Sequence, residues 1–213
     1  MGWLVSLLGS SVGKKWMMAV TGFAFLGFLA AHFAGNLTVF GGREAFNGYA
    51  QKLQSLGPIL HLFRAGLIAC ALVHITTGLL LFLENRRARP VGYQVAASAG
   101  GRTLSSRTMP YTGLLILAFV VFHLFHFTFV PPAPLTIFDR VAAAFRRPEL
   151  AALYTAMMVV VALHVRHGFW SAFQTIGAHH PKYMPWIFAL SLAAAFATAI
   201  GFGSLPILVA ALV

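Results

Sequence analysis

Five long apolar runs, almost free of charged residues, most constrain what this chain of 213 residues can fold into. Apolar residues make up 59% of the sequence and charged residues only 9%, whereas a soluble domain carries about 25% charged residues. The runs cover residues 16–40, 58–83, 109–130, 149–173 and 185–211. Each is long enough to cross a bilayer core of about 30 Å as a helix. The sequence therefore predicts an all-α integral membrane protein, a five-helix bundle forming one transmembrane domain over residues 1–213.

Prolines mark the expected starts of four of these helices. Pro58, Pro110, Pro148 and Pro185 each lie near the beginning of an apolar run. Proline is tolerated in the first turn of a helix, because the N–H that it lacks would have no partner there. We therefore expect each of these residues to lie in a first helical turn.

The N-terminal segment, residues 2–12, is apolar and is followed by Lys14 and Lys15. A secretory signal carries its positive charges before its apolar core, not after it. We therefore expect this segment to lie on the membrane surface rather than to be cleaved.

Basic residues between the apolar runs predict the orientation of the bundle. One set of connections carries Lys14, Lys15, Arg86, Arg87, Arg89, Arg102, Arg107 and Lys182. The opposite set carries fewer: Arg43, Lys52, Arg140, Arg146 and Arg147, with Glu44 and Asp139. Because positively charged connections stay on the cytoplasmic side, the N-terminus and the 84–108 loop are expected inside. Residues 40–57 form an unusually long outer connection, which is expected to cap the bundle end.

Histidines gather inside the apolar runs. Those well inside are His32, His74, His123, His126, His164 and His167, and His61 lies at a helix entrance. An intramembrane histidine is costly and normally faces the bundle interior. A single one most often makes a hydrogen bond between helices. Here each of the first four runs carries at least one histidine well inside it and the fifth carries none, which favours a shared ligand site.

The depths of these histidines predict two pairs. His32 and His123 lie about 16 and 14 residues into runs that enter from the inside, so both lie toward the outer side. His74 and His164 lie about 16 and 15 residues into runs that enter from the outside. Two imidazole pairs at two depths are what two stacked bis-histidine haems need. Zinc would need three or four ligands at one depth.

Small residues near these histidines would leave room for a flat macrocycle. Gly78 and Gly168 follow His74 and His164 by four residues, and Gly35 and Asn36 hold similar positions after His32. Each glycine thus shares a helix face with its histidine, which favours His164 over His167 as the ligand. Helix packing alone is an alternative role for these glycines. Depth does not decide between His123 and His126.

With these residues in place, the sequence resembles the dihaem cytochrome b anchor subunit of succinate:quinone oxidoreductases, of the single-chain five-helix type. The matching segments, in order over residues 10–177, are SSVGKKWMMAVTG, AHFAGNLTVFGGREAFN, LVHITTG, VVFHLFHF and LHVRHGFWSAFQTIG. The resemblance implies His32 and His123 as ligands of an outer haem iron, and His74 and His164 as ligands of an inner one.

The resemblance also implies partners and cofactors outside this chain. A flavoprotein with FAD and an iron–sulfur protein would dock on the inner face and interconvert succinate and fumarate. This chain would pass electrons through two haem b groups to or from a quinone, usually menaquinone in the two-haem type. It would lie in the bacterial inner membrane with its N-terminus inside.

A few further residues are candidates for contact with the haems or with quinone. Haem propionates want basic partners near the interface, and Lys15, Arg107 and Arg166 are inner-side candidates, with Trp170 beside them. Arg166 has the alternative of extending to the interface for its own solvation. Glu44 is a candidate for proton exchange with quinone at the outer side, against an exposed pairing with Arg43 or a helix-start charge.

Two other functions stay open from the residues alone. The chain could be a dihaem subunit of another quinone-linked dehydrogenase, which the order of the matching segments argues against. It could also be a haem-free transporter or assembly protein, whose histidines only hold helices together.

Overall fold

The computed structural model describes residues 2–88, 103–130 and 135–212, and all regular structure in these ranges is helical. The elements are α1 (Gly2–Gly9), α2 (Ser11–Leu37), the 3₁₀ turn η1 (Thr38–Gly41), α3 (Gly42–Gln54), α4 (Pro58–Arg87), α5 (Leu104–Phe127), α6 (Ile137–Phe145), α7 (Pro148–Thr175), α8 (Met184–Phe196), the π-helix η2 (Ala197–Phe202) and α9 (Gly203–Leu212). Five helical segments are long and apolar enough to cross a membrane, which confirms a multi-pass membrane protein.

Two helix starts differ from the sequence expectation. Helix α2 begins at Ser11 rather than at residue 16, because the Ser10 hydroxyl accepts a hydrogen bond from the Gly13 N–H. Helix α5 begins at Leu104 rather than near Pro110, because the Thr103 hydroxyl accepts from the Ser106 N–H. Both are hydroxyl caps of the usual kind. The expectation that Pro110 starts its helix was therefore wrong, since Pro110 lies inside α5.

The other three prolines lie where they were expected. Pro58, Pro148 and Pro185 all occupy the first turn of their helices. Their missing N–H groups therefore leave no intrahelical hydrogen bond unmade.

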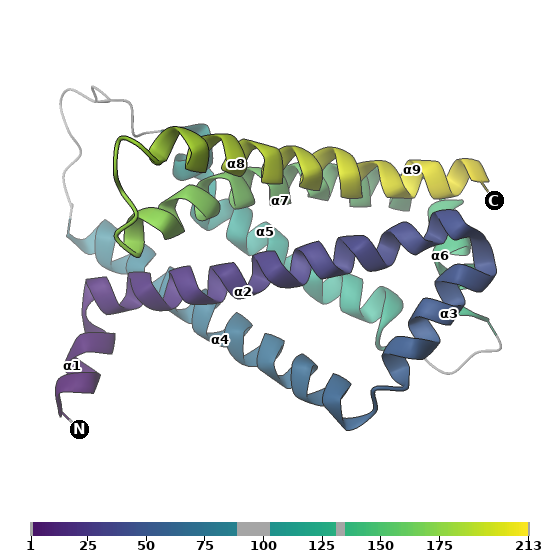
Figure 1. Ribbon diagram of the computed structural model, residues 1–213, viewed down its shortest axis with the longest axis horizontal. Helices are drawn as coiled ribbons and strands as arrows, with labels where there is room; N and C mark the ends of the chain where they lie inside the picture. Colours follow the sequence, from purple (N-terminus) through teal and green to yellow (C-terminus); the bar gives the residue numbers. More distant parts are fainter. Residues whose placement is uncertain (1, 89–102, 131–134, 213) are drawn as a thin grey trace.

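The spanning helices form two antiparallel hairpins, with the last span packed on the second. Helix α2 packs along α4, and α5 packs along α7. The hairpins meet mainly where α2 runs beside α7, while α4 and α5 touch over a short stretch. Helices α8 and α9, joined through the π-helix, cover α7 (Figure 1). Figure 1 shows α1 at one end of the molecule, and α3, α6 and the C-terminus at the other.

The two ends of the bundle are fastened by polar contacts. At the α1 end, an ion pair between Lys14 and Glu84 ties α2 to α4. Arg89 and Arg102, which were expected at this end, lie outside the described residues.

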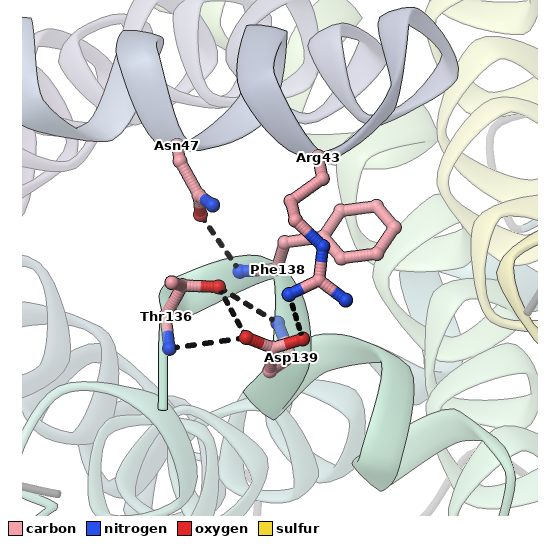
Figure 2. Close-up of polar contacts among 5 residues, drawn as sticks. All are labelled: Arg43, Asn47, Thr136, Phe138 and Asp139. Atoms are coloured by element: carbon pink, nitrogen blue, oxygen red, sulfur yellow. Dashed lines mark hydrogen bonds and ion pairs between the residues drawn. The ribbon is translucent and has the colours of Figure 1, made fainter. Parts of the chain in front are cut away.

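At the opposite end, the connection over residues 40–57 is not a loop but largely the helix α3, which packs against α6. Arg43 pairs with Asp139, and the Phe138 N–H donates to Asn47 Oδ1 at 3.1 Å (Figure 2). Thr136 caps α6 by exchanging hydrogen bonds with Asp139. We call these five residues the α3–α6 latch. It joins the connecting segment of the first hairpin to that of the second.

Candidate functional site

The structure brings the four predicted ligands together as the two predicted pairs. The ring centroids of His32 and His123 lie 6.0 Å apart, and those of His74 and His164 lie 6.4 Å apart. Each pair takes one ring from each hairpin, because His32 and His74 belong to α2 and α4 while His123 and His164 belong to α5 and α7. The pairs therefore lie between the hairpins.

We call His74 and His164 the inner pair and His32 and His123 the outer pair, after the depths expected from the sequence. Both rings of the inner pair contact a threonine hydroxyl of the neighbouring helix. Thr21 Oγ1 lies 2.9 Å from His74 Nδ1, and Thr112 Oγ1 lies 3.1 Å from His164 Nδ1. Each hydroxyl also lies within hydrogen-bond distance of a carbonyl one turn earlier in its own helix, Met17 for Thr21 at 2.7 Å. Since a hydroxyl has one proton to donate, the carbonyl takes it and the imidazole Nδ1–H donates to the threonine oxygen. This arrangement leaves the Nε2 lone pair of each ring free to bind a metal.

These contacts repeat across the two hairpins. Thr21 precedes His32 by eleven residues on α2, and Thr112 precedes His123 by eleven residues on α5. Eleven residues are close to three helical turns, so each threonine and its histidine share a face about 16 Å apart. Helices α2 and α5 thus each supply one histidine of the outer pair and one threonine that contacts a histidine of the inner pair. The sequence reasoning missed this repeat, whose only signal is the spacing.

Glycines beside the inner rings are not the ones that the sequence indicated. A Cβ on Gly22 would lie 3.7 Å from Cε1 of the α4 histidine, and a Cβ on Gly113 would lie 3.4 Å from Cε1 of the α7 histidine. Gly78 instead faces the Met18 thioether at 3.6 Å, and Gly168 faces open space. The glycines that lie close to the rings are therefore Gly22 and Gly113, which directly follow Thr21 on α2 and Thr112 on α5.

Aromatic rings surround the outer pair. His32 stacks against both Phe28 and Phe202, with ring centroids 5.4 and 5.8 Å away. Asn36 Nδ2 donates to the His32 carbonyl at 2.8 Å and lies 3.4 Å from ring Nε2. His123 Nδ1 is buried without a hydrogen-bond partner. Ring packing and the Asn36 amide, rather than a hydroxyl, thus surround this pair.

The π-helix of the last span places Phe202 against His32. A Cβ on Gly201 would lie 2.7 Å from Cζ of Phe33, so glycine at this position lets the Phe33 ring pack closely against the π-helix. The Thr155 hydroxyl donates to the Gly203 carbonyl at 2.9 Å, which fastens α9 to α7 just after the π-helix. Short π-helices are frequent at functional sites. The fifth span therefore contributes to the outer pair although it has no histidine.

The two alternative histidines lie outside the pairs. His126 Nδ1 lies 2.9 Å from the hydroxyl of the buried Tyr154, in a cluster of phenylalanine rings. His167 lies edge-on to Trp170, with ring centroids 5.2 Å apart, and its Nδ1 is buried without a partner. Trp170 also packs on Phe188 of α8. The geometry therefore favours His123 and His164 as ligands.

The basic residues expected near the inner end differ in their surroundings. Lys15 and Arg107 are exposed, Lys15 on the first turns of α2 and Arg107 on the first turn of α5. Arg166 is half-buried, and its Nη1 lies 3.5 Å from the hydroxyl of the fully buried Ser105. Arg166 is thus the one of the three that reaches between helices.

Glu44 lies exposed in the first turn of α3. Its neighbour Arg43 pairs with Asp139 of α6, so the alternative of an Arg43–Glu44 pair is wrong. A carboxylate at this position is favoured by the positive end of the helix dipole.

The donor set fits haem better than a metal held by protein alone. Two imidazoles on opposite sides of one metal ion have ring centres roughly 6 Å apart, since each metal–nitrogen bond is about 2 Å long, and both pairs match this spacing. Within the described residues, no group of three or more histidine, cysteine, aspartate or glutamate side chains gathers at one point. A site with two protein ligands needs the remaining ones from the cofactor, as a porphyrin supplies them.

Comparison with protein-family models, curated proteins and solved structures gave no match to this chain.

Proposed function

We propose that this chain is a dihaem cytochrome b anchor subunit of a succinate:quinone oxidoreductase. The observation that carries the proposal is the pair of neighbouring imidazoles at each of two levels between the two hairpins, with ring centroids 6.0 and 6.4 Å apart. The order of the five matching sequence segments over residues 10–177 supports the choice of enzyme family. The chain itself would not act on succinate, which is the task of the soluble partners.

The chain's own residues would hold two haem b groups. His32 and His123 would bind the outer iron, and His74 and His164 the inner one. Haem iron supplies a one-electron carrier, because it changes between the ferrous and ferric states. Thr21 and Thr112 would keep the inner rings in the Nδ1–H tautomer and turn Nε2 toward the iron.

The end of the bundle that carries α1 would face the cytoplasm and receive the iron–sulfur protein and the FAD-containing flavoprotein. Lys14, Lys15, Arg107 and Arg166 all lie toward this end. Arg166, held by the Ser105 hydroxyl, would also meet a propionate of the inner haem, with Lys15 and Arg107 nearer to water. The membrane would be the inner membrane of a bacterium.

Quinone, in this proposal menaquinone, would exchange electrons near the outer pair. Glu44 lies at the same end of the bundle as the α3–α6 latch, exposed on α3. An exposed carboxylate there can pass protons between quinone and water. Glu44 would therefore act in proton exchange and would not bind metal.

A reduced-minus-oxidised visible spectrum of the purified complex, with haem quantified per copy of this chain, tests the proposal. We expect two low-spin b haems, both reduced by succinate. Absence of haem from a freshly isolated, intact complex contradicts the proposal and favours the haem-free transporter or assembly role. Two haems with a different set of soluble partners would instead assign the chain to another quinone-linked dehydrogenase.

A further inference from the structure

The last spanning segment is interrupted by the π-helix η2, which lies between α8 and α9. Among the described residues, η2 is the only π-helix. A π-helix places an extra residue in its turn, and an α-helix turns by about 100° per residue. The residues at the end of η2 and beyond therefore lie on a face about 100° away from the one that an uninterrupted α-helix would give them.

Neighbouring helices hold this segment on both sides. On the α2 side, a Cβ on Gly201 would lie 2.7 Å from Cζ of Phe33, so the ring and the backbone of η2 are in close contact. On the α7 side, the Thr155 hydroxyl donates a hydrogen bond to the Gly203 carbonyl at 2.9 Å. The rotated face is therefore fixed in position against α2 and α7.

This rotation brings Phe202 to the ring of His32. The two ring planes are 28° apart, and those of Phe28 and His32 are 12° apart, so both phenyl rings lie nearly parallel to the imidazole. Phe28 is 43% exposed and belongs to the same helix as His32. Phe202 instead packs against the buried core and against Phe33, with ring centroids 4.8 Å apart. Phe202 is therefore the more firmly packed of the two.

Hydrogen bonding does not determine how the His32 ring is turned. The amide nitrogen of Asn36 lies 3.5 Å from ring Nδ1 and 3.4 Å from ring Nε2, so it does not distinguish the two nitrogens. The torsion that turns a histidine ring about its Cβ–Cγ bond is broad. A firmly packed phenyl ring restricts this torsion, because a turned imidazole would push its edge into the face of the phenyl ring.

We propose that Phe202 is a positioning residue for the outer pair, and that through it the π-helix of the fifth span sets the plane of the His32 ring at the outer iron. The inference rests on the proposed haem function and adds a role for a span that supplies no ligand. The planes of His32 and His123 are 81° apart. The largest g value of a low-spin ferric haem rises as the planes of its two imidazoles approach a right angle, so the outer haem should give a strongly anisotropic signal.

Electron paramagnetic resonance of the oxidised complex, with haem titration of the apo-protein, tests this role. The signal that is missing from His32→Ala identifies the outer site. Phe202→Leu keeps an apolar side chain but removes the ring face, so the imidazole takes a range of angles. We expect the largest g value of the outer signal to fall, its line to broaden, and outer-site affinity to fall roughly two- to tenfold, the usual contribution of an aromatic pair. Phe202→Tyr keeps the ring and should behave as the wild type.

Phe196→Leu is the matched control, because it makes the same substitution on the same span at a ring that is 61% exposed. It should leave both signals and both affinities unchanged. The inner signal should be unchanged in every variant, which shows that the bundle is folded. Where Phe202→Leu fails this check, Gly201→Ala replaces it. Its Cβ displaces the Phe33 ring that packs on Phe202, and it should move the outer signal in the same direction.

Three results would overturn the inference. Phe202→Leu could match Phe196→Leu at the outer site, Phe202→Tyr could change the outer signal as much as Phe202→Leu does, or both haems could change equally. Each would mean that the ring face of Phe202 does not set the plane of His32. Two haems with an outer signal insensitive to Phe202 would leave the proposed function standing, whereas a wild type without haem would contradict that function and the inference with it.

Discussion

Replacing Thr21 or Thr112 with valine tests whether the inner histidines are oriented for a ligand or only packed. Valine keeps the shape of threonine but has no hydroxyl to accept the imidazole Nδ1–H. In the wild type these contacts are 2.9 and 3.1 Å long. After substitution the ring loses the group that fixes its tautomer, while the helix backbone is expected to stay in place.

The size of the expected loss differs between a threonine that orients a haem ligand and one that only joins two helices. A hydrogen bond that only joins two membrane helices contributes about 0.6 kcal/mol on average. Removing a group that orients a metal-bound histidine typically costs about 10- to 100-fold in metal affinity, which is about 1.4–2.8 kcal/mol. If the threonines orient ligands, haem affinity at the inner site therefore falls at least tenfold. If they only join helices, thermal stability changes slightly and haem affinity is unchanged.

Haem titration of the apo-protein, followed by low-spin electron paramagnetic resonance, measures the effect at each site. We expect Thr21→Val and Thr112→Val to weaken the inner site alone, and Thr21→Ser to restore it. Thr76→Val is the matched control, because the exposed Thr76 hydroxyl donates only to carbonyls of its own helix, Leu72 at 2.6 Å. Inner-site affinity and spectrum that match this control in both valine variants would refute the orienting role.

Three further predictions concern other parts of the molecule. His32→Ala should remove the outer haem and keep the inner one, whereas His126→Ala should keep both, as haem quantification will show; loss of the outer haem alone from His126→Ala would contradict the pairing. Gly113→Val should disturb the inner low-spin signal, because a Cβ there already lies 3.4 Å from the facing imidazole; an unchanged signal would mean that the ring is free to move. The Thr136 hydrogen bond lowers the pKa of Asp139, so the latch should keep its full stability above the ordinary aspartate value of 3.8 and lose it as the pH falls through the lowered value. Hydrogen exchange in α3 and α6 should therefore rise only at acid pH, and Asp139→Asn should abolish that dependence.

The number and type of the spanning helices could be predicted because apolar length alone determines them. The residues at which these helices begin were harder to predict, since hydroxyl caps such as Ser10 and Thr103 lie in polar stretches before the apolar residues begin. Pro110 was misplaced because proline is also tolerated inside membrane helices, where neighbouring groups can satisfy the freed carbonyl. Helices α3 and α6 are short and partly polar, so a search for long apolar runs does not find them.

Depth predicted which helices share a histidine pair, because a helix rises by a constant amount per residue. The choice of His123 over His126 came instead from the family resemblance, and that of His164 over His167 from the glycine spacing. The hydrogen-bond partners of the rings could not be predicted from the sequence, since they depend on the rotation of each helix about its axis. Thr21 and Thr112 carry no charge, and threonine next to glycine is ordinary in a membrane helix. The surroundings of the outer pair depend on the π-helix, which shifts the face of α9 and brings Phe202 to His32.

The α3–α6 latch also bears on how the protein is made. Its two halves emerge from the ribosome at different times, because α3 lies before the second spanning helix and α6 lies after the third. Membrane helices insert first and associate afterwards, and segments synthesised earlier fold earlier. His32 and His74 are therefore expected to lie without their partner rings until α5 and α7 have been translated, since His164 follows Asp139 in the chain. Biogenesis is thus expected to proceed as two insertions followed by one docking event. A chain with a broken latch would be expected to dock its hairpins more slowly, because the contact of α2 with α7 would then have to bring them together without help from α3 and α6.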